Sequence, residues 1–127
     1  MTQEDKELLL KDLCEKLPYK TYVKTEKGIG YVYAINTSQL IEISVANESE
    51  YWSEVFNIDK IKPYLRPMSS MTEEEKIDYR AFFNYDGVEY PEEYIDWLNK
   101  HYFDYRGLIE KGLAIEAPDD MYKIKDK

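Results

Sequence analysis

The chain of 127 residues has little of the chemistry on which metal centres and disulfide scaffolds depend. It contains one cysteine, Cys14, and one histidine, His101, which excludes an internal disulfide and a zinc site built from cysteine and histidine of one chain. Its longest nearly apolar run, residues 29–35, is far shorter than the ~18 residues that span a bilayer. The acidic start lacks the basic and then apolar pattern of a signal peptide. These absences predict a cytoplasmic protein without membrane association.

Basic residues are also scarce: 17 Lys and Arg stand against 26 Asp and Glu, for a net charge of −9. Binding of duplex DNA needs a positive surface, so direct DNA binding is disfavoured. Residues 72–116 hold 12 acidic and five basic residues, so most of the negative charge lies on predicted helices. Such a face could imitate a phosphate backbone, which leaves a DNA-mimic inhibitor of a DNA-binding protein as one alternative to ordinary solvated charge.

Hydrophobic periodicity predicts an α+β fold in a single domain of residues 1–127. We divide it into a helix (1–19), a β unit (20–62), a connector (63–71), a helical part (72–118) and a tail (119–127) that we expect to be loose. The first helix begins with N-cap and N3 residues Thr2 and Asp5, and Pro18 ends it. Its leucines recur at helical spacing, which predicts one buried stripe.

The β unit shows apolar residues alternating with polar or small ones, in segments of about ten residues separated by turns. Ile29, Tyr31, Tyr33 and Ile35 follow this pattern in the second segment. We expect an antiparallel sheet of four to five strands, either packed on the first helix or curled into a small SH3-like barrel.

The C-terminal half is predicted to be helical after a connector whose two prolines, Pro63 and Pro67, exclude a regular helix or a central strand. Thr72 followed by three glutamates predicts a helix start, and the helix should run to about Asn84. Residues Ile77, Phe82 and Phe83 are expected to point inward from it. A second helix should run from Pro91 to about His101, and a third, short one from Asp104 until Gly112 stops it.

Three segments resemble a family of short uncharacterised proteins from gut anaerobic bacteria and their phages and mobile elements. They are KELLLKDLC with LPY near the start, KPYLRPMSSMTEEE over residues 62–75, and DWLN with FDYRGLIEKGLAIEAP over residues 96–99 and 103–118. The resemblance covers roughly half of the chain and carries no known activity, cofactor or catalytic residue. It implies a bacterial or phage origin, a setting in which small acidic proteins often bind and block a host component.

No candidate for catalysis stands out. Cys14 and His101 could form a nucleophile pair, but nothing in the sequence places them together, and a buried thiol and a helix-end histidine explain them as well. The paired carboxylates lie at predicted helix starts or in the tail, where solvated charge is the simpler explanation. We therefore predict no enzyme, no catalytic residue, no metal site and no cofactor.

Tyrosine is the unusual residue, with 13 copies, and tyrosine offers large rigid contact area with a polar group at its end. The candidate binding residues are Tyr31, Tyr33, Tyr51, Trp52, Tyr64, Arg66, Tyr105 and Arg106. The leading hypothesis is a non-enzymatic interaction protein that binds a host protein, with self-association left open. The alternatives are the DNA mimic and a nucleotide-sequestering protein that acts against host defence signalling and holds its ligand between aromatic rings and Arg66.

Overall fold

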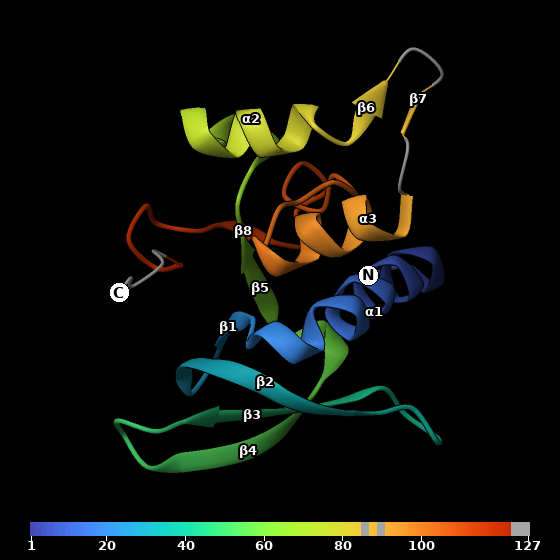
Figure 1. Ribbon diagram of the computed structural model, residues 1–127. Helices are drawn as coiled ribbons and strands as arrows, with labels where there is room; N and C mark the ends of the chain where they lie inside the picture. Colours follow the sequence, from blue (N-terminus) through green and yellow to red (C-terminus); the bar gives the residue numbers. More distant parts are fainter. Residues whose placement is uncertain (85–86, 89–90, 123–127) are drawn as a thin grey trace.

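The computed structural model describes residues 1–84, 87–88 and 91–122, and it shows a stack of layers (Figure 1). The α-helices in these ranges are α1 (Gln3–Lys16), α2 (Glu73–Arg80) and α3 (Pro91–Lys100). Strands β2 to β4 lie at the bottom of Figure 1, α1 lies above them, and α3 and then α2 follow upward. No helix in the described ranges is long and apolar enough to cross a membrane.

A six-stranded sheet forms the base of the molecule, in the order β4-β3-β2-β1-β5-β8. Its strands are β1 (Tyr22–Thr25), β2 (Gly28–Asn36), β3 (Glu42–Asn47), β4 (Trp52–Asn57), β5 (Lys62–Leu65) and β8 (Ile115–Glu116). All neighbours pair antiparallel except β5 and β8, and a separate hairpin joins β6 (Phe83–Asn84) to β7 (Gly87–Val88). The predicted α+β fold is confirmed, and the described strand pairs leave the sheet open, with β4 and β8 as its two edges.

Strand β5 corrects the prediction that prolines exclude a central strand from the connector. Pro63 is buried and pairs with Val23 of β1, in the interior of the sheet. The pairing with β8 begins only at Tyr64, so the missing N–H of Pro63 removes no bond from that ladder. A proline at the start of a short strand is tolerated for this reason.

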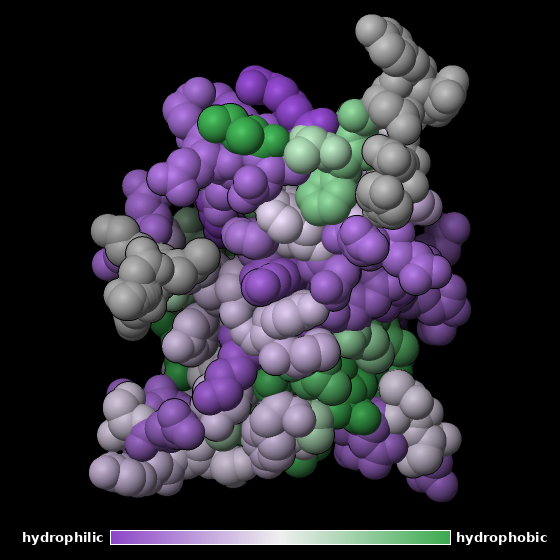
Figure 2. Space-filling model, in the orientation of Figure 1, coloured by the Kyte–Doolittle hydropathy of each residue, from purple (hydrophilic) through white to green (hydrophobic). Residues whose placement is uncertain are grey.

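Helix α1 follows its sequence signals closely. Thr2 and Asp5 form the predicted capping box, with the Asp5 N–H donating to the Thr2 hydroxyl over 3.0 Å. Leu9 and Leu13 are buried in a core that also draws on the sheet and on residues 108–114. Figure 2 shows hydrophobic atoms reaching the surface where α1 meets the sheet, so this core is incompletely covered on that side.

The C-terminal half departs from expectation at three places. Helix α2 has its predicted Thr72–Glu75 capping box but ends at Arg80. Ile77 and Phe83, predicted to point inward, are 64% and 40% exposed, and Phe83 lies in β6 instead of the helix. The predicted third helix is a series of turns, in which Asp104 accepts hydrogen bonds from the N–H groups of Leu108 and Ile109. A carboxylate that satisfies these donors holds the turns without a helix.

The first part of the tail, up to Tyr122, is not loose as predicted. Tyr122 holds it in place. Its hydroxyl accepts from the Tyr22 N–H over 2.8 Å and donates to the Tyr64 carbonyl over 2.9 Å. Its ring stacks on Tyr102 with the centroids 3.7 Å apart. Two hydrogen bonds therefore bind the tail to strands β1 and β5, and the ring contact binds it to the segment after α3. Residues 123–127 of the predicted tail lie outside the described ranges.

Candidate functional site

The candidate site is the face of the sheet turned away from α1, which we call the outer sheet face. Val23, Val32 and Val45 are buried on the opposite side, and side chains alternate along a strand, so their neighbours point outward. The register of the strands then brings together Tyr22, Lys24, Ile29, Tyr31, Tyr33, Ser53, Val55, Lys62 and Tyr64.

A bulge in β2 explains how Tyr33 comes to lie on this face while Ile35 faces the core. Val32 pairs with Val45 and Ala34 pairs with Ser44, so the residue between them has no partner in β3. The Tyr33 hydroxyl lies 2.8 Å from the Ser53 hydroxyl of β4. The bulge thus reverses the facing pattern after Tyr33, which corrects the simple alternation expected from Ile29 to Ile35.

Several outer-face side chains are half exposed and yet held in place. Tyr33 is 50% exposed, Val55 52% and Ile29 42%, although the sheet beneath them is continuous. The Tyr31 hydroxyl donates to Glu48, and the ammonium of Lys20 lies 4.7 Å from the centre of the Tyr31 ring. The face therefore presents oriented rings, for which binding costs little side-chain entropy.

Two lysines give the outer sheet face a local positive charge in an acidic chain. Lys24 of β1 and Lys62 of β5 are directly opposed in the register, and both are exposed. None of the ion pairs among the described residues involves either of them. Like charges directly opposed across two strands are destabilising, so this pair is not explained by the stability of the sheet.

Tyr51 and Trp52, also predicted as site residues, lie where the turn after β3 leads into β4: Tyr51 is in the turn and Trp52 is the first residue of β4. Tyr51 is 92% exposed and has a φ of 59°, a left-handed conformation that is uncommon for tyrosine. Trp52 is partly buried beside Phe56, and Lys27 lies over its ring. The structure places these two residues at the start of β4, outside the outer sheet face.

Arg66 is engaged within the chain. Its two terminal nitrogens donate to the two carboxylate oxygens of Glu75 over 2.7 and 2.8 Å, and the guanidinium lies over the Phe103 ring. Burial alone would raise the pKa of Glu75, but the hydrogen bonds from Arg66 hold that pKa below its usual range. The pair fixes the start of α2 to the connector.

Tyr105 and Arg106 contact a buried group of charged side chains on α1, and the sequence did not predict this network. Asp12 and Lys16 are fully buried, and the Lys16 ammonium donates to Asp12 Oδ1 over 2.6 Å. Arg106 donates to the same Asp12 oxygen over 2.7 Å and to Glu15 over 2.6 Å. Spacing of four residues marks Asp12 and Lys16 as a helical ion pair, but their burial depends on residues far along the chain.

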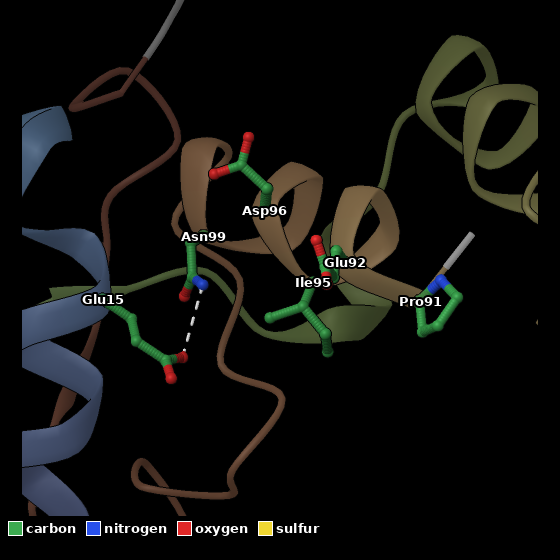
Figure 3. A pocket seen from close by; sticks show the side chains of 6 residues that line it. All are labelled: Glu15, Pro91, Glu92, Ile95, Asp96 and Asn99. Carbon is green, nitrogen blue, oxygen red and sulfur yellow. Dashed lines mark hydrogen bonds between the residues drawn. The ribbon is translucent and has the colours of Figure 1, made fainter.

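This network adjoins a groove of about 500 Å³ between α1 and α3 (Figure 3). In Figure 3 the side chains of Glu15 and Asn99 turn toward each other, whereas the Asp96 carboxylate points away from Glu15. The groove is lined by Glu15, Pro91, Glu92, Ile95, Asp96 and Asn99. Its charged lining is acidic, which is unfavourable for a phosphate-bearing ligand.

The structure gives no support to a Cys14–His101 nucleophile pair. Cys14 is exposed on α1, which corrects the expectation of a buried thiol, and burial of part of its surface together with Glu15 raises its pKa. His101 is bound through Nδ1 to the Trp97 carbonyl and stacks on the Trp97 ring. Among the described residues, no three His, Cys, Asp or Glu side chains are grouped so that they could hold a metal ion.

The predicted binding residues therefore occupy separate places. Tyr31, Tyr33 and Tyr64 share the outer sheet face, and Arg66 is paired with Glu75 at the start of α2. The remaining residues are Tyr51 and Trp52 at the start of β4, and Tyr105 and Arg106 in the buried network. No protein-family model matches the chain, and comparisons with curated proteins and with solved structures give no match either.

Proposed function

We propose that this protein is a non-enzymatic binding protein that docks a protein partner on its outer sheet face. The observation that carries the proposal is the row of half-exposed apolar and aromatic side chains on that face, Ile29, Tyr33 and Val55 among them. Exposed apolar groups gathered on one face are typical of interaction surfaces, and tyrosine is enriched among residues that dominate binding energy.

The shape of the face favours a macromolecule over a small molecule. Small-molecule sites are concave, and the groove that the structure shows lies between α1 and α3, away from these rings. Lys24 and Lys62, which form no ion pair with the described residues, add a polar rim to the apolar row. Rings held by Glu48, Ser53 and Lys20 are already ordered before a partner arrives.

The nucleotide-sequestering alternative loses its main anchor, because the Arg66 guanidinium is already paired with Glu75. The DNA-mimic alternative has one observation in its favour. The first turns of α2 and α3 expose Glu73, Glu74, Glu92 and Glu93 to solvent. A mimic would bind basic proteins through these carboxylates, and its complexes would dissociate as salt screens the charges.

The resemblance of both chain ends to proteins of gut anaerobes and their mobile elements directs the choice of partner. We propose a cytoplasmic protein of such a bacterial host as the partner, with the protein itself encoded by a phage or mobile element. Capture experiments should therefore use the lysate of a gut anaerobe.

The experiment compares three baits in that lysate: the wild-type protein, Tyr31→Ser/Tyr33→Ser, and Ile77→Ser. The double variant removes two outer-face rings, whereas Ile77 is exposed on α2, away from the sheet. We expect one partner to be retained by the wild type and by Ile77→Ser and to be lost from the double variant, at high as well as low salt. Retention by the double variant would refute docking on this face, and loss by salt alone would favour the mimic.

A further inference from the structure

Positive charge is concentrated on the part of the outer sheet face that carries its tyrosines. The rings of this face come from strands β1, β2 and β5, as Tyr22, Tyr31, Tyr33 and Tyr64. The same three strands contain two charged residues, Lys24 and Lys62, and no acidic one. In a chain with a net charge of −9, this region therefore differs in sign from the protein as a whole.

The two lysines lie next to each other and next to exposed apolar surface. Lys24 is paired in the register with Lys62 on one side and with Ile29 on the other. Tyr22 is two positions from Lys24 on the same strand, and alternation places both side chains on the outer sheet face. Ile29 is 42% exposed and Tyr22 37%. A group that contacts these two residues therefore lies within reach of both ammonium groups.

The neighbouring charges leave these two lysines without a counter-ion. Lys27, in the turn after β1, is paired with Glu54, and Glu48 accepts a hydrogen bond from the Tyr31 hydroxyl. Glu26, in the same turn as Lys27, takes part in none of the ion pairs among the described residues. Lys20 adds a further cation, since its ammonium lies 4.7 Å from the centre of the Tyr31 ring.

We propose that the partner docked on the outer sheet face is a protein segment with carboxylate side chains among apolar ones, and that a carboxylate binds between Lys24 and Lys62. This inference rests on the proposed docking at that face. Like charges directly opposed across two strands destabilise a sheet, and an anion placed between them replaces repulsion by attraction. The apolar row supplies contact area, and the lysines determine which partners are accepted.

The distribution of charge favours a protein segment over a single-stranded nucleic acid, whose bases also stack on aromatic rings. A nucleic acid is a polyanion, and the net charge of −9 repels it at long range. Its binding also needs basic residues that follow the backbone along a groove, whereas strands β3 and β4 carry Glu42 and Glu54 and no lysine or arginine. A segment with one or two carboxylates needs only Lys24 and Lys62.

The first test selects short random peptides from a display library on three purified baits: the wild type, Lys24→Gln/Lys62→Gln, and Lys11→Gln/Lys111→Gln. The last variant loses the same charge at exposed positions outside the sheet. We expect the wild type and this control to enrich peptides with Asp or Glu beside apolar residues, and the first variant to lose the preference for acids. Enriched peptides without acids would overturn the proposal and leave docking intact, whereas no enrichment would overturn both.

The second test titrates the most enriched peptide and its Asn/Gln analogue into the same proteins. Loss of the acids should weaken binding to the wild type about fivefold, the effect of two exposed ion pairs, and leave binding to Lys24→Gln/Lys62→Gln unchanged. Equal losses on both proteins would refute contact between the acids and these lysines.

Two controls complete the design. Lys24→Gln/Lys62→Gln should unfold at the same Tm as the wild type or higher, because it removes a repulsion; a lower Tm would show that the lysines stabilise the sheet and would contradict the argument. A short oligothymidylate should bind weakly and equally to wild type and variant. Tighter binding than the acidic peptide, lost in the variant, would show that the face takes single-stranded nucleic acid instead.

Discussion

Neutralising Asp12 should destabilise the protein severely, because its carboxylate holds two cations together inside the molecule. Oδ1 of Asp12 accepts from Lys16 over 2.6 Å and from Arg106 over 2.7 Å, and the side chains of Asp12 and Lys16 are fully buried. Asp12→Asn keeps the shape but removes the carboxylate that pairs directly with the buried Lys16 ammonium. Removing one partner of a buried pair costs about 3–5 kcal/mol.

The matched variant is Lys16→Met, which has nearly the same length as lysine. Asp12 then keeps its bond to Arg106, so the expected loss is that of one charged hydrogen bond, about 1.5–3 kcal/mol. At roughly 4 °C per kcal/mol for a chain of this size, Asp12→Asn should lower Tm by on the order of 10–20 °C, and Lys16→Met by clearly less. The order of the two variants is the informative result.

Urea unfolding followed by circular dichroism measures both variants on one scale, because a shift in midpoint at constant slope reports stability alone. The groove variant Glu92→Gln serves as a control for loss of a negative charge at an exposed position. Equal losses for Asp12→Asn and Lys16→Met, or a loss under about 1 kcal/mol for Asp12→Asn, would refute the view that Asp12 is the shared counter-ion of the network.

Three other perturbations have defined outcomes. The hydrogen bonds from Arg66 lower the pKa of Glu75 in the folded protein. The ionised Glu75 therefore stabilises the fold above pH about 4.3, and this stabilisation is lost as the pH falls through the lowered pKa of the folded state. Glu75→Gln should reduce the fall in Tm that acid causes. Gly30→Ala should destabilise the sheet by about 1–3 kcal/mol in urea unfolding, since the new Cβ would lie 2.6 Å from the Ala46 carbonyl oxygen. Tyr122→Phe should speed amide exchange at Tyr22 and cost about 1–3 kcal/mol, because the amide loses its acceptor; unchanged exchange would show that the tail is not bound there.

Local chemistry made the helix starts predictable from sequence. The capping boxes at Thr2 and Thr72 depend on residues three positions apart, and the structure contains both. The alternation of the β unit also identified its strands, because one side of the sheet is buried against α1. The spacing of Asp12 and Lys16 could have indicated an ion pair.

What could not be predicted depends on residues distant in sequence. The Lys16 ammonium donates to the side-chain oxygen of Asn99, 83 positions further along the chain, and this contact helps to bury the charges of the network. Strand β5 forms in spite of Pro63 because β1 and β8 lie on both sides of it, and neither neighbour is visible in the local pattern. The end of α2 at Arg80 falls where an aromatic cluster around Tyr79 replaces further helical turns.

The Arg66 pairing shows why residue type alone misassigned a candidate. An arginine among aromatic residues resembles an anion site, but the same side chain satisfies a nearby carboxylate when a helix start lies within reach. Burial and pairing, which the sequence does not specify, separate an arginine that binds a ligand from one that binds its own chain.

The irregularity in β2 makes position 33 a place where chain length can vary without cost to the interior. Val32 and Ala34 already face the consecutive residues Val45 and Ser44, so deleting the tyrosine between them would leave every inward-facing residue on its present side. Elsewhere in the ladder, a one-residue deletion would turn the core-facing side chains of the strand toward solvent and the solvent-facing ones toward the core. An engineer could therefore remove or replace this ring freely and reshape what the protein displays while leaving intact what holds it together.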